Sequence, residues 1–174
     1  MRILLLISTL FFASLAQLAS SELRVICYWP NGDTKRNDDF RHTPEDIDPT
    51  LCTHIHYAFM LLDEQHMKPV DSNGSPQVDL YNRINALKQK NPNLKHVMSI
   101  GGWGDKSSKY SHVIGNVEKR KVFKQHLIEY MQKYKFDGLD IDWEYPVCWQ
   151  GDCNAGPPSD KTNLAIFVRV SCNK

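Results

Sequence analysis

Residues 136–146, Phe136-Asp137-Gly138-Leu139-Asp140-Ile141-Asp142-Trp143-Glu144-Tyr145-Pro146, alternate acidic and apolar side chains over most of their length. This period of two predicts a β-strand from Phe136 to Glu144, because successive side chains of a strand point to opposite faces. Asp140, Asp142 and Glu144 then share one face, and the apolar residues between them pack on the other. Neighbouring acids on that face lie about 6.6 Å apart, so their repulsion raises the pKa of at least one of them.

Three carboxyl groups in a row favour a chemical function. A carboxyl that stays protonated near neutral pH can act as a general acid and protonate a leaving-group oxygen. Glu144 ends the strand, and barrels of parallel strands carry their active sites at the carboxyl ends. Two alternatives stay open from the pattern alone. One is a solvated acidic edge strand, which leaves Trp143 and Tyr145 unexplained, and the other is a calcium or magnesium site built from carboxylates.

Upstream, short apolar segments alternate with amphipathic ones, and this order decides the fold class. Such an alternation predicts parallel βαβ units. A complete (β/α)8 barrel needs about 250 residues, so we predict an α/β fold equal to the N-terminal half of a (β/α)8 TIM barrel, with four parallel strands and intervening helices. Strands are predicted at 23–29, 53–60, 94–100 and 136–144, helices at 78–90, at 117–134 and from 163 onward, and loops at 33–48, with a helical turn after Thr43, and after residue 60.

The start of the chain has the pattern of an export signal. Met1-Arg2 supplies positive charge, residues 3–18 are mostly apolar, and Ala19-Ser20-Ser21 offers the small residues that signal peptidase cleaves. The alternative is a transmembrane anchor, for which the apolar run is short, since a span needs about 20 apolar residues. We therefore predict a signal peptide at 1–21, a catalytic-type domain at 22–174, and secretion to the extracellular space.

Export makes the five cysteines candidates for disulfide bonds. Cys148 and Cys153 lie in one Gly/Pro-rich loop and can close a small ring. Cys27 and Cys52 lie at the ends of successive predicted elements and can join them. Cys172 is left over, and the sequence gives it no partner.

Composition excludes several classes of function. The chain has 174 residues, 24% of them charged, with a formal net charge of +1, as in soluble globular proteins. Near-neutral charge gives no reason to expect nucleic acid or an anionic membrane as a partner.

His54 and His56 share a strand face, but two histidines without a third ligand do not predict zinc. We therefore interpret them as packed or surface residues and expect no metal and no cofactor. Asn73-Gly74-Ser75 is a glycosylation sequon in a turn-rich loop, used or unused.

The stretch from Asp137 to Glu144 resembles the signature of family 18 glycoside hydrolases, the chitinases and chitinase-like proteins. Met98-Ser99-Ile100-Gly101-Gly102-Trp103 resembles the second motif of this family, and the segments around Cys27-Tyr28 and His56-Tyr57-Ala58-Phe59 resemble its first two strands. The loop Cys148–Cys153, followed by Ser159-Asp160-Lys161, is similar to arthropod members. The resemblance extends to about Arg169, so we expect a family domain truncated after about the fourth βα unit.

The resemblance implies a role for each acid. Glu144 protonates the glycosidic oxygen, Asp142 holds and orients the N-acetyl group of the substrate, and Asp140 shares a proton with Asp142. The nucleophile is the acetamide oxygen of the substrate itself, which implies retention at the anomeric centre.

The same resemblance implies a set of substrate-binding residues. Tyr28 and Ser99 are expected to hydrogen-bond the acids. Trp103 and Tyr145 are expected to form a sugar-binding wall, because aromatic faces stack on pyranose rings. The full set is Tyr28, Phe59, Ser99, Gly101, Gly102, Trp103 and Tyr145.

The implied function is a secreted chitinase that hydrolyses β-1,4-linked N-acetylglucosamine polymers, with chitin or chitooligosaccharides as partner and the oligomeric state unpredicted. The alternative is a non-catalytic chitin- or oligosaccharide-binding protein, because the family's later aromatic floor and its acetamide-holding tyrosine and aspartate would follow residue 174. A third hypothesis is a product that does not fold stably. Residues Pro30-Asn31-Gly32-Asp33 stand where catalytic relatives often carry a tryptophan, so a weaker distal sugar subsite is expected.

Overall fold

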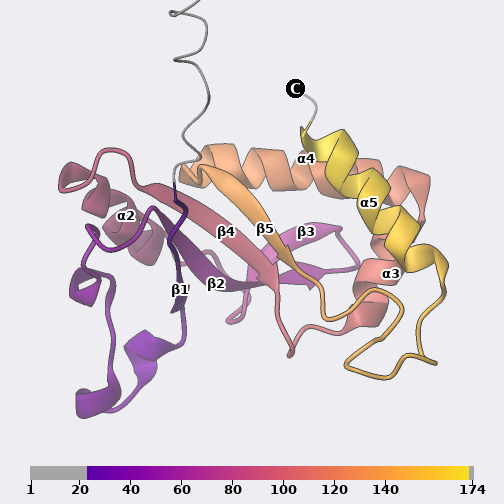
Figure 1. The fold of residues 1–174 in the computed structure, drawn as a ribbon, viewed down its shortest axis with the longest axis horizontal. Helices are drawn as coiled ribbons and strands as arrows, with labels where there is room; N and C mark the ends of the chain where they lie inside the picture. Colours follow the sequence, from indigo (N-terminus) through magenta and orange to yellow (C-terminus); the bar gives the residue numbers. More distant parts are fainter. Residues whose placement is uncertain (1–22, 173–174) are drawn as a thin grey trace, which may run out of the picture.

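A computed structural model describes residues 23–172 as one sheet with helices packed beside it (Figure 1). The predicted α/β fold with four parallel strands is confirmed, and the predicted signal peptide at 1–21 lies outside the described residues. The strands are β1 (Ile26–Pro30), β2 (His54–Asp63), β3 (Lys68–Asp71), β4 (Lys95–Gly101) and β5 (Gly138–Asp142). The α-helices are α2 (Val78–Ala86), α3 (Ser107–Gly115), α4 (Val117–Tyr134) and α5 (Ser159–Cys172), and short 3-10 turns lie at Asp33–Lys35, Asp38–Phe40, Pro44–Asp46 and Leu87–Gln89.

The sheet has the strand order β1-β2-β4-β5, with every neighbouring pair parallel. Strand β3 lies off this path and pairs antiparallel with the end of β2. Helices α3, α4 and α5 gather beside the β4–β5 half of the sheet, whereas α2 lies toward β1 and β2 (Figure 1). Parallel neighbours place all carboxyl ends of the four strands at one edge, where the active sites of such barrels form. Within residues 23–172, none of the helices has the length and apolar character that crossing a membrane demands.

The hydrophobic core lies between the outer face of the sheet and the helices. Tyr57 of β2 and Met98 of β4 sit opposite one another in the register and are fully buried there. Phe123 of α4 and Phe167 of α5 stack with nearly parallel rings, 5.6 Å between their centroids. Trp143, which follows β5, is buried and stacks on Tyr110 of α3, with 5.8 Å between ring centroids. The apolar residues of the acidic strand therefore pack on the face opposite the acids, as their alternation predicts.

Asp71 at the end of β3 ties four segments together. Its carboxylate is 1% exposed and accepts hydrogen bonds from Tyr57 Oη at 2.7 Å, from Tyr81 Oη, and from Asn31 Nδ2 at 3.2 Å. The backbone N–H of Gln77 adds another at 3.0 Å. A buried carboxylate is tolerated only when such donors replace its lost hydration. Asp71 therefore fixes the loop after β1, the centre of β2 and helix α2 relative to the hairpin.

Three features differ from the predicted elements. The loop expected after residue 60 is instead a hairpin, because β2 continues to Asp63 and β3 returns along it. Strand β3 is four residues long and contains Pro69, so its sequence carries a weak strand signal. Helix α3 was absent from the prediction, although Tyr110, Val113 and Ile114 are spaced for one helical face and are buried. The last helix begins at Ser159 and not at 163.

Both predicted disulfide bonds are present. Cys27 in β1 is bonded to Cys52, which precedes β2, and Cys148 is bonded to Cys153 in the loop after β5. The first bond closes a chain separation of 25 residues, so it restricts the unfolded chain more than the short ring does. The side chain of Cys172 lies outside the described part of the structure.

We predict that Asp71→Ala lowers the free energy of unfolding by about 3 kcal/mol or more. The substitution leaves several buried donors without an acceptor, and each unsatisfied buried donor is costly. Urea denaturation followed by circular dichroism measures the change. The neighbouring Ser72, whose side chain is exposed, provides the control Ser72→Ala, for which we expect a change within about 0.5 kcal/mol. A similar loss in both variants would contradict the role given to Asp71.

Candidate active site

The three predicted acids gather at the carboxyl end of β5. Asp140 and Asp142 belong to the strand, and Glu144 follows two residues after its end. The strand is shorter than the predicted 136–144, because the backbone leaves the sheet after Asp142. All three side chains are half-buried. They are thus close enough to influence one another's charge while they remain accessible to a ligand.

Donors from three strands converge on one oxygen of Asp140. Its Oδ2 accepts hydrogen bonds from Tyr28 Oη at 2.8 Å and from Ser99 Oγ at 2.6 Å, and it lies 3.2 Å from His56 Nδ1. Burial alone would raise the pKa of this carboxyl, but the hydrogen bonds from His56, Ser99 and Tyr28 lower it to about 2. Asp140 is therefore a carboxylate at neutral pH. The predicted contacts of Tyr28 and Ser99 with the acids are present.

Asp142 has the opposite electrostatics. Burial raises its pKa, and the charges of Glu144 and Asp140 raise it further. The repulsion predicted from the alternating acids therefore acts on the middle member of the row. The pKa of Tyr28 is raised to about 12, first by burial and then by Asp140. This phenol accordingly keeps its proton and remains a hydrogen-bond donor at neutral pH.

Glu144 is held through its main chain. Its carbonyl oxygen accepts hydrogen bonds from Ser107 Oγ at 2.7 Å and from the backbone N–H of Gln150 at 3.1 Å. Its carboxyl group makes no hydrogen bond or ion pair with any residue in the range 23–172. The backbone is thus fixed while both carboxyl oxygens stay available to a ligand.

Gln150 joins the two loops that flank the acids. Its Nε2 donates to the carbonyl oxygens of Trp103 at 3.4 Å and Asp105 at 3.3 Å, and its Oε1 accepts from the backbone N–H of Ser107 at 3.3 Å. One side chain therefore holds the loop after β4 against the loop that carries Glu144. The sequence pattern did not single out Gln150 or Ser107, because their partners are main-chain groups of a distant loop.

Glycines allow β4 and β5 to approach closely at the acids. A Cβ on Gly101 would lie 2.2 Å from the carbonyl oxygen of Asp142, and Gly101 has φ +120°, a region that L-residues rarely adopt. The backbone N–H of Gly102 donates to that same oxygen at 2.8 Å. A Cβ on Gly102 would also press on the ring of Phe59, at 3.0 Å. Both glycines predicted for the site thus support the acid strand through its backbone.

Three of the aromatic side chains predicted for the site are largely exposed. Trp103 is 59% exposed and Tyr145 is 49% exposed, which is unusual for residues of this size. Tyr28 is 50% exposed, and its ring lies 6.1 Å from that of Phe59 between centroids. Exposed aromatic rings of this kind are the form of surface on which sugars stack.

Comparison with known proteins identifies the family. Residues 24–172 match the sequence model described as Glycosyl hydrolases family 18. The chain belongs to this family. Among curated family relatives, Probable chitinase 10 of Drosophila melanogaster is 40% identical over 153 residues, which cover 86% of this chain and 7% of the relative.

Solved structures of glycosyl hydrolase family 18 agree with this assignment. A mutant of the Ostrinia furnacalis Group II chitinase catalytic domain 2, in complex with penta-N-acetylchitooctaose, (NAG)5, matches with a TM-score of 0.80 and 39% identity. The match covers 86% of this chain and 39% of that one. Human YKL-39, described as a pseudo-chitinase with retained chitooligosaccharide binding properties, matches with a TM-score of 0.71 and 30% identity, over 85% of this chain and 37% of that one. The chain therefore spans less than half the length of these relatives.

His56 lies in the candidate site, where the sequence interpretation did not place it. It was interpreted as a packed or surface histidine, and it is indeed buried, but its ring nitrogen contacts the Asp140 carboxylate. The structure places His56 opposite Tyr28 in the β1–β2 register, and this pairing could not be read from the local sequence. No group of three or more metal-binding side chains is arranged to hold an ion anywhere in the part of the chain that the structure describes.

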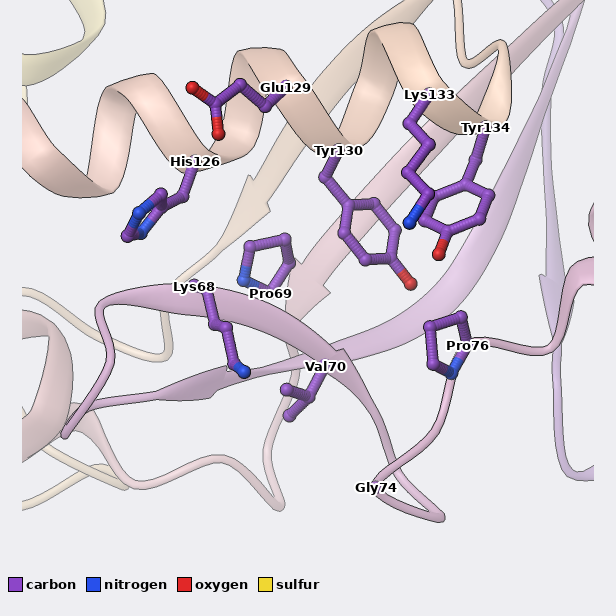
Figure 2. A pocket seen from close by; sticks show the side chains of 10 residues that line it. All are labelled: Lys68, Pro69, Val70, Gly74, Pro76, His126, Glu129, Tyr130, Lys133 and Tyr134. Atoms are coloured by element: carbon purple, nitrogen blue, oxygen red, sulfur yellow. The ribbon is translucent and has the colours of Figure 1, made fainter.

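A separate pocket lies away from the candidate active site. It has a volume of about 290 Å³ and lies between the β3 hairpin and helix α4 (Figure 2). Tyr130, Lys133 and Tyr134 face it from the helix, and Lys68 and Val70 face it from β3 (Figure 2). None of the three acids lines it, nor does Tyr28, Trp103 or Tyr145, so the pocket is distinct from the candidate active site.

We predict that Gly101→Ala destabilises the domain by about 2 kcal/mol or more. The new Cβ must displace the backbone of β5, and the alanine must hold a backbone conformation that is strained for an L-residue. Chemical denaturation measures the effect. Gly104→Ala is the matched control, because a Cβ on Gly104 meets no atom within 4 Å. An equal, small effect of the two substitutions would show that the β4–β5 contact does not constrain the fold.

Proposed function

We propose that this chain provides the acid machinery of a secreted chitinase that hydrolyses β-1,4-linked N-acetylglucosamine polymers with retention of anomeric configuration. The observation that carries the proposal is the division of charge among the three acids. Asp140 is held as an anion, Asp142 has a raised pKa, and the carboxyl of Glu144 has no partner in the described residues. Such unlike environments for neighbouring carboxyls are the mark of an acid–base site.

In the proposed reaction, Glu144 donates a proton to the glycosidic oxygen while the bond from that oxygen to C1 breaks. The acetamide oxygen of the same sugar attacks C1 and forms a cyclic intermediate, so no protein carboxylate serves as nucleophile. Asp142 holds the acetamide N–H and orients it, and Asp140 shares a proton with Asp142. Glu144, now ionised, removes a proton from water as the water attacks C1 and the bond from C1 to the acetamide oxygen breaks. This step regenerates the acetamide, restores the acid and gives net retention.

The substrate class is supported by the wall and by the relatives. Trp103, Tyr145 and Tyr28 are exposed aromatic side chains, and Tyr28 donates a hydrogen bond to Asp140. An Ostrinia furnacalis relative has been solved with a chitooligosaccharide bound. We propose that chitin or its oligosaccharides lie along these aromatic faces, with Phe59 and the backbone at Gly101 and Gly102 supporting the wall.

Secretion and the domain limits are part of the same proposal. The two disulfide bonds suit an oxidising, extracellular environment. We propose that residues 1–21 direct export and that residues 22–174 form the family 18 portion of the protein. Amino-terminal sequencing of the protein recovered from culture medium tests this directly, since a start near residue 22 is expected and an intact Met1 would contradict it.

We predict that Glu144→Gln lowers hydrolysis of a fluorogenic chitooligosaccharide by about 10²–10⁴-fold, because an amide cannot donate the proton. Binding of the oligosaccharide, measured by calorimetry, is expected to change little. Glu129→Gln on the exposed side of α4 makes the same chemical change away from the acids, and we expect it to retain activity.

Two results would contradict parts of this proposal. Equal turnover by the native protein and Glu144→Gln would remove Glu144 from the role of acid. Binding without any turnover by the native, folded protein would favour the alternative function, an oligosaccharide-binding protein. The second outcome has a precedent in the pseudo-chitinase among the relatives.

A further inference from the structure

We infer that His56 is a positioning residue for the acids: it donates a hydrogen bond that keeps the negative charge on Asp140 and thereby leaves the shared proton on Asp142. This inference rests on the proposed function and adds a residue of β2 to it. His56 acts through Asp140. Within residues 23–172 its ring makes no hydrogen bond to Asp142 or Glu144.

The position of His56 is fixed from several sides. It lies in β2 between β1 and β4, opposite Tyr28 on one side and Val97 on the other, and it is only 6% exposed. Its ring meets that of Tyr28 edge-on, with 4.8 Å between centroids and an interplanar angle of 61°. The imidazole therefore cannot swing away to solvent, and its Nδ1 is aimed at the acid strand, 3.2 Å from Asp140 Oδ2.

The local donors and acceptors decide where the imidazole proton lies. Ser99 Oγ is 2.6 Å from Asp140 Oδ2 and has one proton, which it donates to that carboxylate. Ser99 Oγ is also 3.3 Å from His56 Nδ1, where it can only accept. A bare lone pair on Nδ1 would then face two oxygen acceptors. The arrangement is favourable only if Nδ1 carries a proton and donates it.

The polar and titratable groups around the hydrogen bond between His56 and Asp140 explain its importance. Strand β1 contributes Tyr28, β2 contributes His54 with its ring 6.5 Å from that of His56, and β4 contributes the uncharged Ser99. Strand β5 and the residues after it contribute Asp142 and Glu144. Burial raises the pKa of Asp142 and the charges of Glu144 and Asp140 raise it further, so Asp140 and Asp142 compete for the proton that they share. Without its donors, Asp140 would take up that proton.

The donors are distributed unequally between the two aspartates. Asp140 Oδ2 has three partners, whereas the side chain of Asp142 receives no hydrogen bond from residues 23–172. Consistent with this, the pKa of Asp140 is held at about 2 despite burial, with His56 first among the groups that lower it, and the pKa of Asp142 is raised. Removal of one of three donors should therefore give a graded effect and not a complete loss.

The test compares three variants of the full chain. His56→Phe keeps a ring but removes the donor. His56→Asn keeps an N–H close to the position of Nδ1. His54→Asn makes the same change at the neighbouring histidine, whose Nδ1 lies 2.8 Å from the hydroxyl oxygen of Thr53. The pH profile of chitooligosaccharide hydrolysis is measured for each, together with kcat and KM.

For His56→Phe we expect kcat to fall roughly tenfold with KM changed less than about twofold, which is the effect of one lost hydrogen bond to a charged group. The acidic limb of the pH profile should move to higher pH by about one unit. The shift is upward because loss of a donor raises the pKa of Asp140, so the active ionised form of Asp140 is lost at a higher pH than in the native protein. His56→Asn should restore the limb, and His54→Asn should leave it in place.

A fall in kcat without a shifted limb in His56→Phe, or a failure of His56→Asn to restore the limb, would overturn the inference and leave His56 with a packing role. Long-range proton–nitrogen NMR of His56 provides a test that does not depend on turnover. A protonated Nδ1 is expected, and an unprotonated Nδ1 would overturn the inference even in an active protein. If the native chain binds but does not hydrolyse, the proposed function fails, and the NMR titration of the Asp140 carboxyl in the same variants still decides the role of His56.

Discussion

The convergence of three strands on one carboxylate oxygen is the constraint on which the site depends. Tyr28, His56 and Ser99 come from β1, β2 and β4, and each approaches Asp140 on β5. A half-buried carboxylate needs hydrogen-bond donors in place of water. The order of the strands brings these donors to Asp140, and the donors in turn keep Asp140 ionised. The acid row is consequently a property of the whole sheet and not of the strand that carries it.

The parts of the site that the sequence predicts are those with a local signature. Asp140, Asp142 and Glu144 stand two residues apart, and this spacing alone places them on one face with unequal pKa values. Gly101 and Gly102 end a strand-like run, and the close approach of β5 supplies the physical reason for them. The four parallel strands followed from segments that each carry their own periodicity, and the family resemblance added the chemical roles.

The parts that escaped prediction depend on contacts between distant residues. His56 and Asp140 are separated by 84 positions, and nothing in the residues around His56 distinguishes it from His54. Strand β3 is too short and too rich in polar residues to show a period, and its structure relies on Asp71 satisfying side chains of β2 and α2. Helix α3 has a correct apolar spacing over only one face and nine residues, which competes poorly with the glycines and serines around it.

The contacts of Gln150 have a consequence for how such a site diversifies. Every hydrogen bond recorded for it, to Trp103, Asp105, Ser107 and Glu144, has a main-chain group as its partner. A clamp of this kind does not depend on which side chains the two loops carry. Substitutions that alter ligand preference along the loops can therefore accumulate in evolution without moving the acid, and the chemistry can be inherited while the specificity drifts.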